Sequence, residues 1–111
     1  MIVAQRSLYV RSDAKSRPVE VLVTFGAPYP DKSAWRCDFS IGWPEGSSGG
    51  YGMGYDSAQA LLSALQLVAV QLYASRYHHS GSLYFDESAA GYGFPLPASG
   101  RDLAVGLDKK L

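Results

Sequence analysis

The chain has 111 residues, of which 47% are hydrophobic, and its ten basic and ten acidic side chains give a formal net charge of zero at pH 7. This length and apolar content predict a single domain over residues 1–111 with one continuous core. A nucleic-acid-binding protein usually carries a basic excess or stripe, because phosphate neutralisation supplies much of its affinity, so we expect no nucleic-acid partner.

The first part of the chain reads as strands separated by loops. Residues 2–10 alternate loosely between apolar and polar side chains. A polar loop over 11–17 leads to a second strand at 19–25, in which apolar and mostly β-branched side chains recur at every second position. So short a loop favours an antiparallel hairpin. We predict another loop over 26–33, which contains two prolines.

The clearest strand pattern covers residues 35–43, and Pro44 ends it. Apolar side chains alternate there with small or polar ones. One face is therefore predicted to be buried and the other wet, which is typical of an antiparallel sheet covered on a single side. The predicted buried face carries Trp35, Cys37, Phe39, Ile41 and Trp43.

The glycine-rich stretch that follows, 46–54, has two competing interpretations. In the first, 47–50 is a hairpin turn and 51–55 is a fourth strand, with bare glycine on the face where a helix or an aromatic ring approaches the backbone. In the second, the glycines bind a phosphate at the start of the next helix. We favour the first, because the motif G-x-x-x-x-G-K-[ST] is absent and Asp56 occupies the helix cap that an anion would need.

Residues 56–79 are predicted to form one long helix. Asp56 is a good N-cap, and Gln59 occupies the capping-box position, from which its side chain reaches back to the cap N–H. Polar residues interrupt the apolar pattern, so we expect no membrane span, and Gly81 is placed to cap the C-terminal end. One broad stripe is apolar, and three further apolar residues lie outside it: Leu61, Ala64, Leu65, Val68 and Leu72 in the stripe, and Leu62, Leu67 and Val70 beside it.

A short strand is predicted over 82–85, followed by a Gly/Pro-rich irregular segment and a loosely held tail over 98–111. Together the elements predict an α+β fold in the order β-β-β-β-α-(β). We expect an antiparallel meander of about four strands, with the long helix packed across the apolar face of residues 35–43.

Cys37 is the only cysteine, so no intrachain disulfide can form and a reducing cytoplasm is the expected location. The first residues lack the basic and apolar regions of a signal peptide, and we expect a soluble protein. A thiol and a histidine can form a nucleophile and base. The place of Cys37 on the apolar face of a strand predicts a buried, inert thiol instead.

His78 and His79 suggest a metal site, to which Asp86 and Glu87 could add carboxylates. Adjacent helical positions diverge by about 100°, however, and a zinc site normally needs three or four convergent ligands. We therefore predict no metal and no cofactor. The two histidines are expected to interact with the negative end of the helix or with water.

The aromatic residues have two interpretations. Tyr51 and Tyr55 project from the glycine-rich strand, and Tyr92 and Phe94 stand between glycines in an extended segment. In one interpretation these rings only pack over the helix ends and the glycine face. In the other, all four lie outside the core and form a surface for a protein partner or for self-association, because tyrosine offers a large contact area with a polar tip.

The strand with Trp35 and Cys37, the sequence Gly-Tyr-Asp-Ser-Ala-Gln-Ala-Leu at 54–61 and Gly-Phe-Pro at 93–95 resemble a family of small bacterial single-domain proteins of unknown function. In that family a β-rich N-terminal half with a tryptophan leads into a capped helix of the form G-x-D-S-x-Q-A-L. The resemblance implies the fold and a bacterial origin. It brings no catalytic residues to transfer.

Three functional hypotheses follow. The first is a non-enzymatic protein-binding module that neutralises or regulates a partner, by analogy of size and class with small bacterial immunity proteins. The second is a homodimer with a structural role, joined through an open sheet edge or through the apolar helix residues outside the stripe. The third is a small enzyme or metal protein with a site between the helix and the C-terminal segment, using His78, His79, Asp86 or Glu87.

Overall fold

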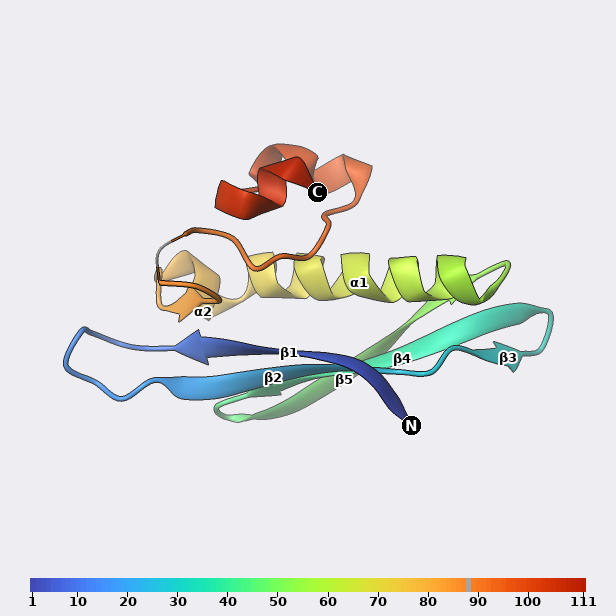
Figure 1. The fold of residues 1–111 in the computed structure, drawn as a ribbon, viewed down its shortest axis with the longest axis horizontal. Helices are drawn as coiled ribbons and strands as arrows, with labels where there is room; N and C mark the ends of the chain where they lie inside the picture. The colour runs from blue at the N-terminus through green and yellow to red at the C-terminus, as the bar shows by residue number, and fades with distance from the viewer. Residues whose placement is uncertain (88) are drawn as a thin grey trace.

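The computed structural model describes residues 1–87 and 89–111. Within them, one antiparallel sheet has the strand order β5–β4–β2–β1–β6, and the short β3 pairs with β4 beyond the end of β2. Figure 1 shows this sheet as one layer beneath the main helix. The predicted α+β meander is confirmed. The strands are β1 (Ile2–Val10), β2 (Val19–Gly26), β3 (Tyr29–Asp31), β4 (Ala34–Trp43), β5 (Gly46–Gly54) and β6 (Leu83–Tyr84).

Two of the predicted loops are wrong in part. Residues 26–33 include β3, because the chain turns back along β4 and Tyr29 pairs with Arg36. The hairpin after β4 turns at Pro44 and Glu45, so Trp43 pairs directly with Gly46. The residues 47–50, predicted as a turn, therefore belong to a strand that begins at Gly46, five residues earlier than predicted. Pro44 explains the earlier turn, since it has no N–H to donate to a ladder.

The main helix α1 (Ser57–Ala74) begins as predicted and ends early. The Asp56 carboxylate accepts the N–H of Gln59 at 2.8 Å, and the Gln59 side chain accepts the N–H of Tyr55 at 2.6 Å, one residue before the expected cap. The predicted end at 79 is wrong, because Ser75 leaves the helical conformation. Its hydroxyl donates to the Leu72 carbonyl and accepts the N–H of His78, which starts the separate helix α2 (Arg76–His79).

Helix α1 lies directly on the glycines of β5. A Cβ on Gly52 would stand 2.3 Å from the Ala64 nitrogen, and one on Gly54 would stand 2.5 Å from the Ala60 nitrogen. On Gly50 the space is filled by the Phe39 ring. The predicted bare glycine face is therefore confirmed, and this close contact rotates the helix: Ala60 is fully buried, whereas Leu61 and Leu65 of the predicted stripe are only half-buried.

The core lies between the sheet and α1. The apolar face predicted for residues 35–43 does face the helix, with Cys37, Phe39 and Ile41 buried and the two tryptophans at its ends half-buried. Helix α1 also meets a length and composition test for membrane spans, which core helices of water-soluble proteins meet too, and 33% of it is buried here. The other strands contribute Leu8, Val21, Val23 and Phe25, and the helix contributes Ala60, Ala64, Val68, Ala69, Leu72 and Tyr73.

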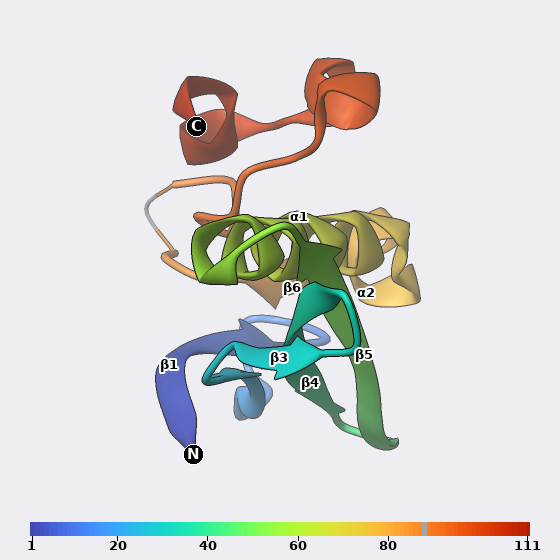
Figure 2. The ribbon, with the colours of Figure 1, turned by 90° about the vertical axis from the view of Figure 1, so that its right-hand side faces the viewer.

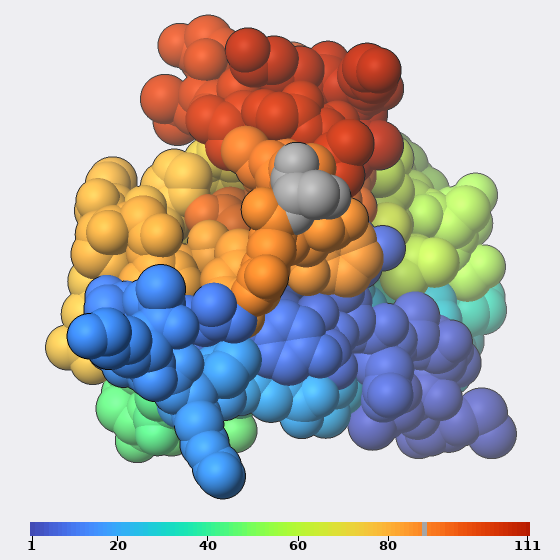
Figure 3. Space-filling model, turned by 60° about the vertical axis from the view of Figure 1, so that its left-hand side comes forward, coloured from blue at the N-terminus to red at the C-terminus, as the bar shows by residue number. Residues whose placement is uncertain are grey.

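The C-terminal segment forms a third layer on the far side of α1, as the end view in Figure 2 shows. It contains two short 3-10 helices, η1 (Ala98–Leu103) and η2 (Gly106–Lys110). In Figure 3 they stand over the helix layer, with the chain that leads to them running past β1. Residues 98–111 are not the loose tail that the sequence suggested, because Ala104 and Asp108 are buried against the rest of the molecule.

Candidate functional site

The face of the sheet that points away from α1 is uncovered in the described structure (Figure 1). Register places Tyr51 opposite Asp38, Met53 opposite Arg36, and Arg36 opposite Tyr29. Residues directly opposite one another in a ladder share a face, so these side chains form one surface on this side of the sheet. We call it the outer-face patch, defined as Tyr29, Arg36, Asp38, Tyr51 and Met53.

The patch is held together by contacts among its own side chains. The Arg36 guanidinium carbon lies 3.9 Å from the centre of the Tyr51 ring, and the Arg36 Nε donates to Asp38 at 2.7 Å. The Tyr29 hydroxyl donates to the other oxygen of Asp38 at 3.1 Å. This carboxylate raises the pKa of Arg36 above its ordinary value, chiefly through the hydrogen bond. The patch therefore presents two aromatic rings and a fixed cation to solvent.

Tyr51 and Tyr55, two of the residues singled out in the sequence, lie at the surface. Tyr51 is 48% exposed, and Tyr55 follows the end of β5 with 92% of its surface exposed. Neither contributes to the core. The sequence did not single out Tyr29 and Arg36, because β3 was hidden in a predicted loop and their pairing with β4 and β5 depends on register.

The other two, Tyr92 and Phe94, are each only 4% exposed, which corrects the expectation that they lie outside the core. The reason is the backbone conformation of the glycine that precedes each ring. Gly91 and Gly93 have φ of +98° and +79°, a conformation that turns the chain inward and that glycine adopts without strain. Phe94 then packs against Phe25 with ring centres 5.9 Å apart.

Tyr92 belongs to a buried polar cluster that local sequence reasoning missed. Asp108 is fully buried, and its carboxylate accepts the Tyr73 hydroxyl at 2.7 Å and the backbone N–H groups of Tyr92 and Gly93. Burial raises the pKa of Tyr73 to about 12 and also raises that of Tyr92. The cluster fixes the C-terminal layer onto α1, and the carboxylate itself is fully buried.

The four residues of the metal hypothesis do not come together as one ligand set, although the rings of His78 and His79 lie 5.8 Å apart. His78 contacts the Tyr92 hydroxyl through Nδ1, with its pKa lowered by burial, and His79 is exposed. Glu87 forms an ion pair with Arg11. Among the described residues, no group of three His, Cys, Asp or Glu side chains is placed to hold a metal ion.

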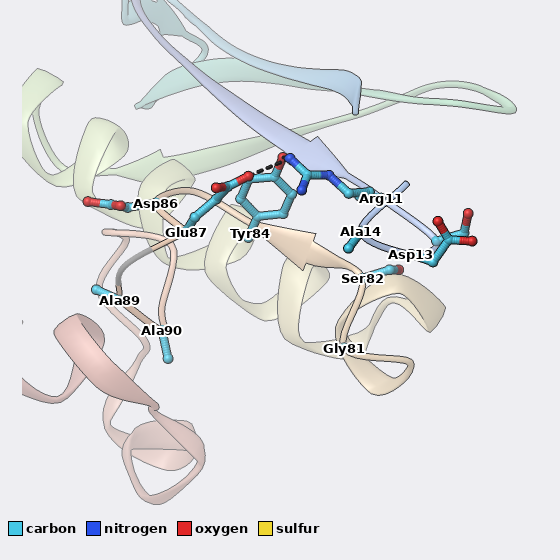
Figure 4. A pocket seen from close by; sticks show the side chains of 11 residues that line it. Arg11, Asp13, Ala14, Gly81, Ser82, Tyr84, Asp86, Glu87, Ala89 and Ala90 are labelled. Carbon is cyan, nitrogen blue, oxygen red and sulfur yellow. Dashed lines mark hydrogen bonds and ion pairs between the residues drawn. The ribbon is translucent and has the colours of Figure 1, made fainter. Parts of the chain in front are cut away.

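A hollow of about 610 Å³ lies beside this ion pair, between the loop after β1 and the chain that follows β6. Figure 4 shows Glu87 directed at Arg11, whereas Asp86 and Asp13 point to opposite sides. Arg11 also donates to the Tyr84 hydroxyl at 2.9 Å. Arg11 and Glu87 in this hollow are thus engaged with each other, and Arg11 also with Tyr84.

Cys37 and the glycine stretch are structural. Cys37 is fully buried, burial raises the pKa of its thiol, and the thiol faces the Gly26 carbonyl at 3.4 Å. A neutral buried thiol is a poor nucleophile. The space beside Gly52 and Gly54 is filled by helix backbone, which leaves no room there for a phosphate.

A family model described as a domain of unknown function, DUF6968, matches residues 4–96. The chain belongs to this family. The matched region includes β1 from its third residue, the other five strands, both α-helices and the outer-face patch. It ends before η1 and η2, and therefore before Asp108. No curated protein and no solved structure matches the chain.

Proposed function

We propose that this member of the DUF6968 family is a non-enzymatic protein-binding module, of an immunity-like or regulatory kind, which contacts its partner through the outer-face patch and Tyr55. The observation that carries the proposal is the patch itself: Tyr29, Arg36, Tyr51 and Met53 gathered on the uncovered face of the sheet. The family assignment supplies no activity, so the argument rests on the chemistry of this surface.

The composition of the patch supports binding of another protein. Tyrosine, arginine and methionine are among the side chains enriched in protein interfaces, and tyrosine and arginine are enriched among the residues whose truncation costs binding energy. The exposed fractions of Tyr29, Tyr51 and Met53 are 40%, 48% and 39%. Each therefore has surface left to bury against a partner. Asp38 and Arg36 neutralise each other, so the surface is neither strongly basic nor strongly acidic.

The rigidity of the patch also supports the proposal. Arg36 is already held between the Tyr51 ring and Asp38. Asp38 belongs to β4 and Tyr51 to β5, so both contacts are fixed by the sheet. A side chain that is ordered before association loses less entropy on binding, and this saving appears as affinity. The single, buried cysteine is compatible with a reducing compartment, which supports placing this function in the cytoplasm.

The enzyme hypothesis finds less support. His78 contacts Tyr92 and Glu87 pairs with Arg11, whereas a catalytic acid and base need to reach a common substrate atom. We therefore retain the binding module as the conclusion.

Photocrosslinking in the native host tests this function directly. The photoreactive residue p-benzoylphenylalanine is introduced at Tyr51, at Tyr55 and, as a control, at the exposed Asp102 of η1 in the opposite layer. We expect a defined adduct between this chain and a different protein from the first two positions and none from Asp102. A reading frame co-transcribed with this gene would be the first candidate partner to purify.

Titration calorimetry with the purified partner then measures how much the side chains of the patch contribute to the affinity. Arg36→Ala and Tyr51→Ala should each raise the Kd at least about tenfold, which corresponds to about 1.4 kcal/mol. Asp102→Ala should leave it unchanged. An adduct that forms equally from Asp102, or the absence of any heterologous adduct from Tyr51 and Tyr55, would show that the outer-face patch is not a binding surface.

A further inference from the structure

One long edge of the sheet is open. In the part of the chain that the structure describes, β5 pairs with β4 along one side and with no strand along the other. Stable monomers usually protect such an edge with a charge, a proline or a bulge. From Gly46 to Tyr55 the sequence contains no charged residue and no proline, and its pairing with β4 is continuous over nine residues without a bulge.

The outer-facing side chains of β5 are matched in size to a second copy of the same strand. The first half of this row is small and the second half is large: Ser47 and Gly49, then Tyr51 and Met53. An antiparallel pair centred on Gly50 sets each large side chain against a small one. Tyr51 of one copy covers Gly49 of the other, and Met53 lies opposite Ser47. An aromatic ring laid over a cross-strand glycine is a known way to stabilise such a pair.

The helix-facing side of β5 leaves room for this pairing. Its residues there are glycines and Ser48, so no large side chain projects toward a second copy. Helix α1 crosses the sheet diagonally: Ala60 and Ala64 lie over β5, whereas Tyr77, beyond the other end, stacks on Trp43 of β4 at 5.5 Å. Related by a two-fold axis at Gly50 perpendicular to the sheet, the two helices lie antiparallel to each other, and the C-terminal end of each lies over its own β4, one strand back from the shared edge.

Charge at the two ends of β5 also fits a second copy. Arg76, with 74% of its side chain exposed, stands near the start of the strand, where Glu45 lies 3.8 Å away. Asp56 caps α1 just after the end of the strand. Antiparallel pairing brings Asp56 of each copy beside the Glu45–Arg76 pair of the other. Arg76 then lies between two carboxylates, and no like charges meet along the strand itself.

We propose that a second copy of this chain pairs antiparallel with β5 about Gly50, so that two sheets become one continuous sheet. Nine paired residues form an edge about 30 Å long. With the helix layer above, the contact covers about 500 Å² on each copy, close to the lower limit for a specific interface. We therefore expect a Kd in the micromolar range. The proposal goes beyond the proposed function: it brings two outer-face patches onto one face and holds whether or not a heterologous partner exists.

Sedimentation velocity of the full chain between 1 and 500 µM tests the proposal. The expected result is a reversible monomer–dimer equilibrium. Gly49→Lys places a charge opposite Tyr51 of the second copy, in a position where an added Cβ makes only an ordinary contact of 3.5 Å within its own chain. This variant should weaken dimerisation at least tenfold. Gln5→Lys puts the same charge on the same face of β1, away from the edge, and should leave the dimer intact.

A distance measurement tests the register without relying on a disruptive variant. A nitroxide label on Ser47→Cys is expected to show an intermolecular distance of about 20–30 Å by pulsed electron resonance, because the two labelled positions lie six residues apart along the paired strands. A chain that stays monomeric at 500 µM, a dimer unaffected by Gly49→Lys, or a label distance beyond 40 Å would each overturn the proposal. None of these results would alter the photocrosslinking outcome at Tyr55, so the two proposals fail separately.

Discussion

Replacing Gly52 by alanine should disrupt the packing of α1 on β5 and lower the free energy of unfolding. The added Cβ would stand 2.3 Å from the Ala64 nitrogen, 2.7 Å from the Ala60 carbonyl oxygen and 2.8 Å from the Ser63 carbonyl carbon. Ordinary contact begins at 3.4 Å, so the helix backbone would have to retreat by about 1.1 Å. A gap of that size forfeits a quarter to a half of the dispersion attraction along the helix. We expect a loss of about 3 kcal/mol, the upper end for an overpacked core, because no flexible side chain can yield.

The assay is urea unfolding followed by tryptophan fluorescence, since Trp35 and Trp43 both lie in β4 beneath the helix. Gly49→Ala is the matched control: it lies in the same strand, is exposed, and its Cβ would meet only the Phe39 carbonyl oxygen at 3.5 Å. It should change the free energy of unfolding by less than about 0.5 kcal/mol. Both variants are compared at sub-micromolar concentration. If Gly52→Ala is as stable as Gly49→Ala, the helix does not rest on the glycine backbone and the account of the core is wrong.

The remaining predictions concern the C-terminal layer. Asp108→Ala should lower the free energy of unfolding by about 3 kcal/mol in the same assay, because buried donors lose their acceptor, whereas the exposed Asp102→Ala should have almost no effect. Burial lowers the pKa of His78, so the unfolded chain takes up this proton first and stability should fall as the pH drops below about 6.5. His78→Gln should reduce this slope between pH 7.5 and 5 and His79→Gln should not; equal slopes for both would contradict the burial argument. Burial raises the pKa of Tyr73 to about 12, so its contribution to stability should be lost as the pH rises above about 10. Tyr73→Phe should remove one late step, near pH 12, from the absorbance titration at 295 nm; if the amplitude is lost near pH 10 instead, Tyr73 ionises like a free phenol.

The sequence pattern predicted the sheet well because strand alternation is a local property. The face of residues 35–43 and the bare glycine face of β5 follow from period two alone, and both are found in the structure. The position of the hairpin turn does not follow from it. Serines and glycines suit both a turn and a strand, and only the neighbouring strand decides between the two.

The end of α1 shows a second limit of periodicity. Apolar positions continue past Ser75 to Tyr77, so the pattern gives no sign of a break. The break comes from one hydroxyl, which hydrogen-bonds to the Leu72 carbonyl and competes with the helical ladder. Serine is common in helices as well as at their ends, so the residue type alone could not fix this boundary.

The C-terminal layer could not be predicted, because the contacts that hold it are distant in sequence. Asp108 meets Tyr73 across 35 residues and Tyr92 across 16. A single aspartate among polar neighbours reads as surface, and a tyrosine between glycines reads as an exposed ring. Both readings fail here, since each buried polar group finds its partner in the other segment. Of the candidate site, Tyr51 was predictable from alternation, but its contact with Arg36 depends on register across β4.

The hydrogen bonds from Arg6 to the carbonyls of Tyr92 and Gly93 join positions 86 and 87 residues apart. Together with the pairing of β6 to β1, they tie the beginning of the chain to a stretch that is synthesised much later. Closing so long a loop costs conformational entropy before the non-local contacts form and offset that cost, and such closures slow folding. The meander and helix can assemble from neighbours, but β1 acquires its second strand partner only when nearly the whole polypeptide has emerged. During part of synthesis, β1 is therefore paired with β2 alone and one of its edges stays open. At that stage a chaperone can bind the open edge.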